Sequence, residues 1–337
     1  MAFYRMTKGS SSPGGPDYSY TCIVNNGGVL EPQQTSFANY FYSNSLFDSP
    51  VDIGDNVINC ASMFSYCTNL NNPIKIGNKV ENCQGMFYNC SNFNSNITFG
   101  DNIKNCFQMF YNCTNLNQQI NMSNNIINGY QMFCNCSLLN NYVTLSTLLN
   151  NARGMFSECY SFNQSIIIPN EVEDCYGMFY NCRDFDNGVV LGNNVRNCSY
   201  MFYNCQKLRY APAMPNTITT CNYTFYNCVN LKIDYQPNYG SYFIPANVIE
   251  CKYTFANCTN LQGNIYFLGN NVWYAFGFLA GCNNSLVKNI HAYNLYEFSK
   301  TSASTSIVGA EITWTQVNGS SKILYNAAYN IYLFNRS

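Results

Sequence analysis

Cysteine is the residue type with the most evident chemical potential in this sequence. The chain contains 19 cysteines, enough for a disulfide scaffold or for metal sites. One series of them lies four residues after a recurring Met position: Cys67, Cys90, Cys113, Cys136, Cys159, Cys182, Cys205, Cys228, Cys258 and Cys282. A second series lies three residues before it: Cys60, Cys83, Cys106, Cys175, Cys198, Cys221 and Cys251.

The replacements in the second series indicate what these cysteines do. Gly129 and Ala152 take the place of Cys there, as a tight core position allows, because free Cys behaves as a small hydrophobic residue. Zinc would need closely paired ligands such as Cys-x2-Cys, which the step from Cys60 to Cys67 does not provide. The odd total also favours thiols over disulfides. We therefore predict buried, reduced thiols, with some disulfides as the alternative.

Few other residues could support catalysis. His291 is the one histidine and has no repeated acid or nucleophile beside it. Glu171, Glu173 and Asp174 are acidic, and a glycosidase needs two carboxylates held a few ångströms apart. The equivalent position after Glu173 is Arg196, so a surface ion pair is the plainer interpretation. We predict that the protein is not an enzyme and needs no cofactor; the alternative is a solenoid that cleaves polysaccharide through Glu173.

A strict repeat must position all these residues. The pair Met-Phe recurs every 23 residues, then continues as Thr224-Phe225, slips by seven extra residues to Thr254-Phe255 and fades at Gly277-Phe278. A fixed period of this length predicts a stack of similar units, each completed by its neighbours. The full pairs begin at Met63, Met86, Met109, Met132, Met155, Met178 and Met201.

One unit, residues 70–92, shows the pattern that the others share. Ile74 and Ile76 alternate with Lys75, which predicts a short half-buried strand. The Gly77-Asn78 turn follows, and then the segment Cys83–Cys90, which we expect to pack inward as a short helical or 3-10 turn. Asn recurs beside this segment, where its side chain could satisfy backbone groups of the bend: Asn89, Asn112, Asn135, Asn181, Asn204, Asn227 and Asn257.

The segment Met-Phe-Tyr-Asn-Cys-x-Asn-Leu with this period resembles the BspA-type leucine-rich repeat. The family has Ala where this chain has Met, often has Pro in the turns, and lacks the additional upstream Cys. The resemblance implies a leucine-rich-repeat-like, β-rich solenoid of about ten coils over residues 51–290. It also implies binding rather than catalysis, since such repeats occur in bacterial surface adhesins and in bacteriophage tail or fibre proteins.

The two ends of the chain do not carry the repeat pattern. Residues 1–50 are expected to form an N-terminal arm or cap, which either covers the first coil or docks the chain on a larger assembly. Residues 291–337 are expected to form a small β cap, because short apolar runs alternate there with turn residues. The expected strands are Ile307-Val308, Glu311–Thr315, Ile323–Tyr325 and Tyr329–Phe334.

Composition limits the kind of partner. Only 10% of the residues are charged and the net charge is −1, so no basic patch predicts nucleic-acid binding. No apolar run is long enough to span a membrane, and the N-terminus has no secretion signal. We therefore expect a virion protein made in a host cytoplasm, with an extracellular or cell-surface location as the alternative.

Aromatic residues give the candidate binding surface. If exposed, tyrosines at one repeat position could stack on sugar rings or anchor a protein; if half-buried, they would join one coil to the next. The insertion adds an aromatic loop, either a binding loop or a tolerated decoration. On the strand face, Ile167, Val190 and Ala213 form an apolar patch. The candidate binding residues are Tyr88, Tyr111, Tyr180, Tyr203, Tyr226, Tyr235, Tyr239, Tyr242 and Phe243.

The sequence as a whole predicts a non-enzymatic structural or binding protein. The favoured setting is a phage virion, as a tail fibre or surface decoration that contacts a host surface glycan or protein or a neighbouring virion protein. The alternative is a bacterial cell-surface adhesin. Self-association into a homo-oligomer fits either setting.

Overall fold

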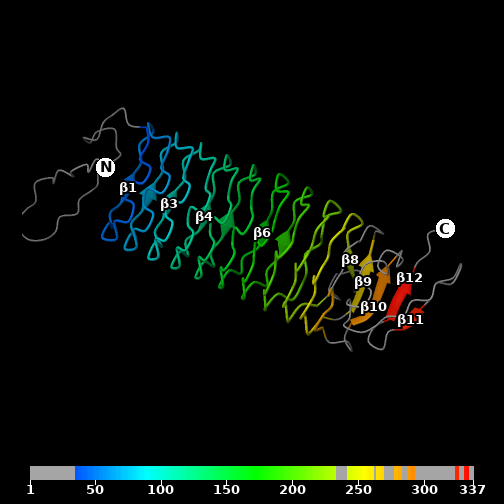
Figure 1. The fold of residues 1–337 in the computed structure, drawn as a ribbon. Coiled ribbons are helices and arrows are strands. Elements are labelled where there is room, and N and C mark those ends of the chain that lie inside the picture. The colour runs from blue at the N-terminus through cyan, green and yellow to red at the C-terminus, as the bar shows by residue number, and fades with distance from the viewer. Residues whose placement is uncertain are drawn as a thin grey trace, which may run out of the picture.

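The structure is a computed structural model that describes residues 35–232, 241–261, 263–268, 277–282, 287–292, 323–325 and 330–333. It is a solenoid in which successive coils stack along one axis (Figure 1). The first coils and the C-terminal sheet lie at opposite ends of the stack (Figure 1). The predicted repeat fold with parallel strands about 23 residues apart is confirmed.

Each regular coil contributes one two-residue strand, and neighbouring strands pair in parallel with equivalent residues opposite each other, as in Ile74↔Ile97 and Ile166↔Val189. The first residue of each strand packs inward and the second faces solvent. The strands are β1 (Val51–Asp52), β2 (Ile74–Lys75), β3 (Ile97–Thr98), β4 (Ile120–Asn121), β5 (Val143–Thr144), β6 (Ile166–Ile167) and β7 (Val189–Val190).

The turns after these strands bring neighbouring backbones unusually close. A Cβ on Gly77 would lie 2.5 Å from the Gly54 carbonyl oxygen, and one on Gly100 would lie 2.2 Å from the Gly77 oxygen. Both contacts are far inside van der Waals distance, so only glycine fits these turns without displacing the adjacent coil.

The prediction of a helical turn at Cys-x-x-Met-Phe-x-x-Cys is wrong, because the described residues contain no helix. In Cys60–Cys67, alternate N–H groups donate to the next coil, for example from Phe64 to the Met86 carbonyl at 2.9 Å. The N–H groups between them donate three residues back within the same coil. Ser62 and Tyr66 have φ of 53° and 64°, and this left-handed backbone at every fourth residue prevents a helix from forming.

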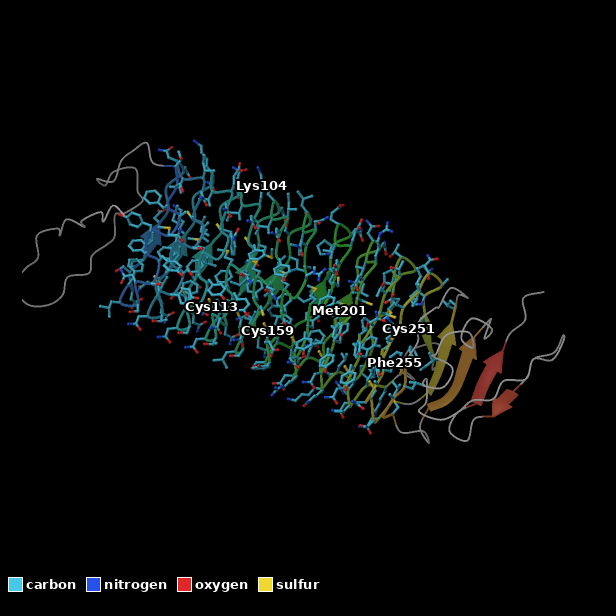
Figure 2. All side chains as sticks on the ribbon, viewed as in Figure 1. Lys104, Cys113, Cys159, Met201, Cys251 and Phe255 are labelled. Carbon is cyan, nitrogen blue, oxygen red and sulfur yellow. The ribbon has the colours of Figure 1, made fainter. Side chains whose placement is uncertain are left out.

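The inward side chains form columns that run along the stack. Phe rings stack from Phe41 to Phe255 with centroids 5.2–5.5 Å apart, within the range of favourable aromatic contact. The Met and Cys residues beside them are equally buried. Figure 2 marks Cys113, Cys159, Met201 and Phe255 along the stack, and Lys104 on its outside. The core is therefore one continuous apolar column rather than a set of separate clusters.

The seven-residue insertion does not interrupt this core. Thr220 pairs with Glu250 across the slip, and the rings of Phe225 and Phe255 stack at 5.3 Å. Residues 233–240 themselves lie outside the described residues. The register of the coils and the stacking of the core therefore continue across the insertion.

The C-terminal strands are longer than those of the regular coils. β8 (Ser241–Ile244), β9 (Gly263–Phe267) and β10 (Val287–Ala292) continue the parallel stack. β12 (Asn330–Leu333) pairs in parallel with β10, and β11 (Ile323–Tyr325) pairs antiparallel with β12. The strands predicted at both places are confirmed, whereas those predicted at 307–308 and 311–315 lie outside the described residues.

Two details refine the ends of the array. Phe278 accepts the Phe255 N–H as Met86 accepts the Phe64 N–H, so Phe278 occupies the Met position and Leu279 the Phe position; the predicted alignment of Gly277-Phe278 with Met-Phe is wrong by one residue. Regular hydrogen bonding already begins at Ser36, which pairs with Asn59. The divisions at residues 50 and 290 stay predictions.

Candidate functional site

The cysteines are structural donors. The thiol of the Cys that follows each Phe donates to the carbonyl oxygen of the Phe one coil earlier, at distances of 2.9–3.1 Å. Cys113, for example, donates to the Phe87 carbonyl at 3.0 Å. This contact joins adjacent coils inside the core, and alanine or valine could not supply it.

All 18 cysteines in the described residues are free, which confirms the predicted reduced thiols there; Cys22 lies outside the described residues. Burial raises the pKa of Cys60, Cys67, Cys198 and Cys282 to about 12. A thiol whose pKa is raised by burial is a poor nucleophile at neutral pH. Within the described residues, no three His, Cys, Asp or Glu side chains are placed to hold a metal ion.

The acidic cluster is divided among ion pairs. Glu173 lies 3.6 Å from Arg196, as predicted, and Asp174 lies 2.8 Å from Arg153. Surface pairs of this kind contribute little stability. His291 lies in β10, and its side chain lies outside the described residues.

The candidate tyrosines stack on one another along the axis. Ring centroids lie 4.9 Å apart for Tyr88–Tyr111, 4.8 Å for Tyr180–Tyr203 and 4.7 Å for Tyr203–Tyr226. All five are half-buried. Within each stack the ring faces cover one another, so these faces cannot also stack on a sugar. Tyr235 and Tyr239 lie outside the described residues, as do the side chains of Tyr242 and Phe243 in β8; their role stays a prediction.

A second tyrosine column was missed from the sequence. Tyr200, Tyr223 and Tyr253 stack at 4.8 and 4.9 Å, and they flank Tyr203 and Tyr226 at 5.8 and 5.7 Å. All three have φ between 52° and 58°, a conformation that costs a non-glycine residue roughly 1–2 kcal/mol. Their regular position, one residue before Met, was the signal that could have revealed them.

The first tyrosine column is interrupted for two coils. Between Tyr111 and Tyr180 the same position holds Cys134 and then Ser157. Cys134 is buried, and burial raises the pKa of its thiol to about 11. Neither residue supplies a ring, so Tyr111 and Tyr180 each have one ring face without an aromatic partner among the described residues.

The asparagines beside this column form a ladder of their own. Asn204 donates its side-chain N–H to Asn181 at 2.7 Å, and Asn227 donates to Asn204 at 2.6 Å. These residues have φ near 60°, which Asn tolerates better than most residues. In this ladder Glu158 replaces Asn, accepts from Asn181 at 2.8 Å and keeps φ at 62°.

Two further asparagine columns hydrogen-bond to backbone groups of the bends. The sequence had predicted this role for the ladder that contains Asn181, Asn204 and Asn227 instead. The Asn59 side chain accepts the N–H two residues later at 3.0 Å, and its equivalents repeat this bond. The Asn71 side chain accepts the Asn94 N–H of the next coil at 2.8 Å, again in a repeated pattern. Backbone groups of the bends are thereby paired without water.

The strand face has an apolar centre. The Ile167 and Val190 side chains are 74% and 61% exposed and pair directly across β6 and β7. Ala213, in the next coil, is also exposed. The equivalent positions in earlier coils are polar, among them Thr98 and Thr144.

The geometry places the chain among the leucine-rich-repeat-like solenoids. A family described as "Mycoplasma protein of unknown function, DUF285" matches residues 33–124 and 104–214, together more than half of the chain. A "BspA type Leucine rich repeat region (6 copies)" matches residues 176–301. The chain belongs to the first of these families, and its residues 176–301 match the BspA-type leucine-rich repeat, as the resemblance in its sequence implied.

One solved structure supports the fold independently. A leucine-rich repeat protein from Bacteroides ovatus ATCC 8483 superimposes with a TM-score of 0.52 at 19% identity, over 83% of this chain and 80% of that one. This likeness shows the fold alone. A comparison with curated proteins gave no match. Within the part of the chain that the structure describes, no helix is long and apolar enough to cross a membrane.

Proposed function

We propose that this protein is a non-enzymatic scaffold that binds another macromolecule through its strand face. The observation that carries the proposal is the exposed pair Ile167 and Val190. Singly exposed apolar residues are ordinary on protein surfaces, whereas adjacent ones on a flat sheet indicate a contact site. The face has no net charge at this place, so it suits a protein surface or a neutral glycan.

The rigidity of the array supports a binding role. Parallel bridges join the coils in register from Ser36 to Glu250, and the interior is filled by side chains. A surface held in this way loses little conformational freedom when a partner binds.

The finer proposal concerns the setting. A phage tail fibre or virion decoration would use this face against a host surface or a neighbouring virion protein. The alternative, a bacterial surface adhesin, draws support from the matching family described as a Mycoplasma protein and from the Bacteroides structure. Mass spectrometry of purified phage particles and antibody labelling of intact producing cells distinguish the two, since each setting gives a signal in one experiment.

The strand face is tested by substituting its apolar residues with residues found at the same position in other coils. Ile167→Thr combined with Val190→Thr copies the threonines of Thr98 and Thr144 and should preserve the fold. Ile127→Asn is the matched control, because Ile127 is 45% exposed at another position of the coil and Asn150 follows it in the same column. Binding of fluorescent protein to target cells should fall at least tenfold in the double variant and remain in the control. Retained binding in the double variant would refute the proposal.

Self-association needs its own measurement. Light scattering of the full chain and of a chain that begins at residue 35 compares the assembled state with and without the N-terminal arm, while the first hydrogen-bonded coil remains intact. An oligomer that dissociates on truncation supports docking through the arm. A monomer in both forms supports a stand-alone adhesin.

A further inference from the structure

The interruption of the tyrosine column combines three unusual features in two adjacent coils. Cys134 and Ser157 replace two rings, Glu158 replaces an asparagine, and Tyr111 and Tyr180 border the interruption. Adjacent parallel strands lie about 4.8 Å apart, so three coil steps separate Tyr111 and Tyr180 by about 14 Å. Small side chains occupy the position between them.

One hydrogen bond of the asparagine ladder is missing at this point, between Asn135 and Glu158. In the other steps of the ladder the later residue donates its amide N–H to the earlier one, as Asn135 does to Asn112 at 2.5 Å. Glu158 has no N–H to donate, so the Asn135 side-chain oxygen has no donor among the described residues. Two acceptors, the Asn135 amide oxygen and the Glu158 carboxylate, therefore adjoin without a proton between them.

The Glu158 carboxylate is oriented but not neutralised. It accepts the Asn181 side-chain N–H at 2.8 Å, and its interaction with the neighbouring Tyr160 hydroxyl raises the pKa of Tyr160. Among the described residues it forms no ion pair. Arg183 lies over the Tyr160 ring, with its Cζ 4.7 Å from the ring centroid.

The backbone at Glu158 carries a cost that asparagine would reduce. Its φ of 62° is shared by the equivalent residues of the other coils, and a glutamate adopts this conformation less readily than an asparagine. Seven other coils use Asn at this position. A carboxylate near two tyrosine rings that each stack on only one aromatic neighbour is an arrangement that attracts an organic cation.

We propose that Cys134, Ser157 and Glu158, between Tyr111 and Tyr180, form a site for a guanidinium or primary ammonium group, as carried by Arg or Lys of a partner protein. The cation donates N–H bonds to Glu158 and Asn135 and lies against a tyrosine face. A planar guanidinium matches both contacts, because it stacks on aromatic rings and donates in pairs to carboxylates. This site deepens the proposed binding role, yet it is measured with small cations and does not depend on the strand face.

Ligand-observed NMR with ethylguanidinium, butylammonium and tetramethylammonium chlorides at constant ionic strength tests the site. The first two should bind to the full-length protein, and tetramethylammonium, which has no N–H, should bind more weakly. Equal binding of all three would overturn the hydrogen-bonding part of the proposal, and absence of any binding would overturn the whole of it.

Variants drawn from the array's own residues locate the site. Glu158→Asn restores the ladder, and Ser157→Tyr restores a ring; each should weaken ethylguanidinium binding at least tenfold while the circular dichroism spectrum stays that of the parent. Arg183→Gln should strengthen binding, because it removes the neighbouring cation. Glu171→Gln, at an exposed carboxylate elsewhere, is the control and should leave binding unchanged. Binding that survives Glu158→Asn, or that falls equally in Glu171→Gln, would overturn the proposal.

The strand-face experiment separates the two proposals. If Ile167→Thr with Val190→Thr retains cell binding while Glu158→Asn loses cation binding, the cation site stands and the strand-face proposal fails. If the double variant loses cell binding while Glu158→Asn retains cation binding, the strand-face proposal stands and the cation-site proposal fails.

Discussion

The buried phenylalanine column and the half-buried tyrosine column of this solenoid follow the same 23-residue period but tolerate change very differently. The phenylalanine column continues from Phe41 to Phe255, even across the insertion. The tyrosine column, one residue further along each coil, is interrupted at Cys134 and Ser157. A missing ring in the core leaves a cavity that its neighbours cannot fill, whereas a missing ring at the surface admits water or a ligand. Interruptions of a surface column are therefore informative about function, and continuity of a core column is informative about stability.

The largest effect expected from this contrast is alkaline unfolding. Burial raises the thiol pKa of Cys60 from 9.0 to about 12, and the other core thiols shift in the same direction. Folding therefore favours the neutral thiol, and its contribution is complete below pH 9 and lost as pH rises toward 12. Each thiol should lower the free energy of unfolding by about 1.4 kcal/mol per pH unit in that interval.

Urea denaturation under reducing conditions between pH 8 and 11, followed by circular dichroism, measures this loss. Cys60→Ala, which copies Ala152 of the same column, should reduce the slope of the unfolding free energy against pH by the contribution of one thiol. A midpoint independent of pH up to 11 would contradict the account of the buried thiols.

The next effect compares neighbours in one coil. Phe202→Ala removes a ring stacked between Phe179 and Phe225 and should cost about 3–5 kcal/mol. Tyr203→Ala removes a half-buried ring stacked between Tyr180 and Tyr226. It should cost about 1–3 kcal/mol, at 0.5–1.5 kcal/mol for each of the two ring contacts. Thermal unfolding of the two variants checks the ranking; equal losses would mean that the surface column contributes as much as the core.

The sequence predicted the period, the strands and the buried columns because each depends on which side chains are apolar. The helical turn was predicted wrongly because the spacing of the apolar residues is the same in a helical turn and in this backbone. In both, an N–H group donates to the carbonyl three residues back. Gly85, Gly154 and Gly177, one residue before Met, were the available sign of left-handed backbone. The sequence left open whether these tyrosines bind a partner or join the coils. Ring stacking at 4.7–4.9 Å shows that they join the coils, and their binding role stays a prediction.

Other features could not be read from residue types. The direction of each thiol hydrogen bond depends on which carbonyl the next coil presents, and that follows from the stacking register rather than from composition. Glu158 was not singled out, since an isolated Glu in a row of Asn gains meaning only when its neighbours Asn135 and Asn181 are seen to form a directional ladder. The slip at Phe278 was hidden because either Gly277-Phe278 or Phe278-Leu279 could continue the pattern.

The smallest expected effect separates the two roles of the ladder asparagines, which hydrogen-bond to one another and adopt a left-handed backbone conformation. Asn204 holds φ at 59° and bonds to Asn181 and Asn227. Asn204→Gly removes the side-chain bonds but suits the backbone, whereas Asn204→Ala removes the same bonds and also places an ordinary residue in a left-handed conformation. The alanine variant should therefore be less stable than the glycine variant by roughly 1–2 kcal/mol. Urea midpoints of the two proteins give this difference directly. If glycine proves as destabilising as alanine, the ladder bonds dominate, and the loss of one such bond at Glu158 becomes a larger cost that a bound cation would have to offset.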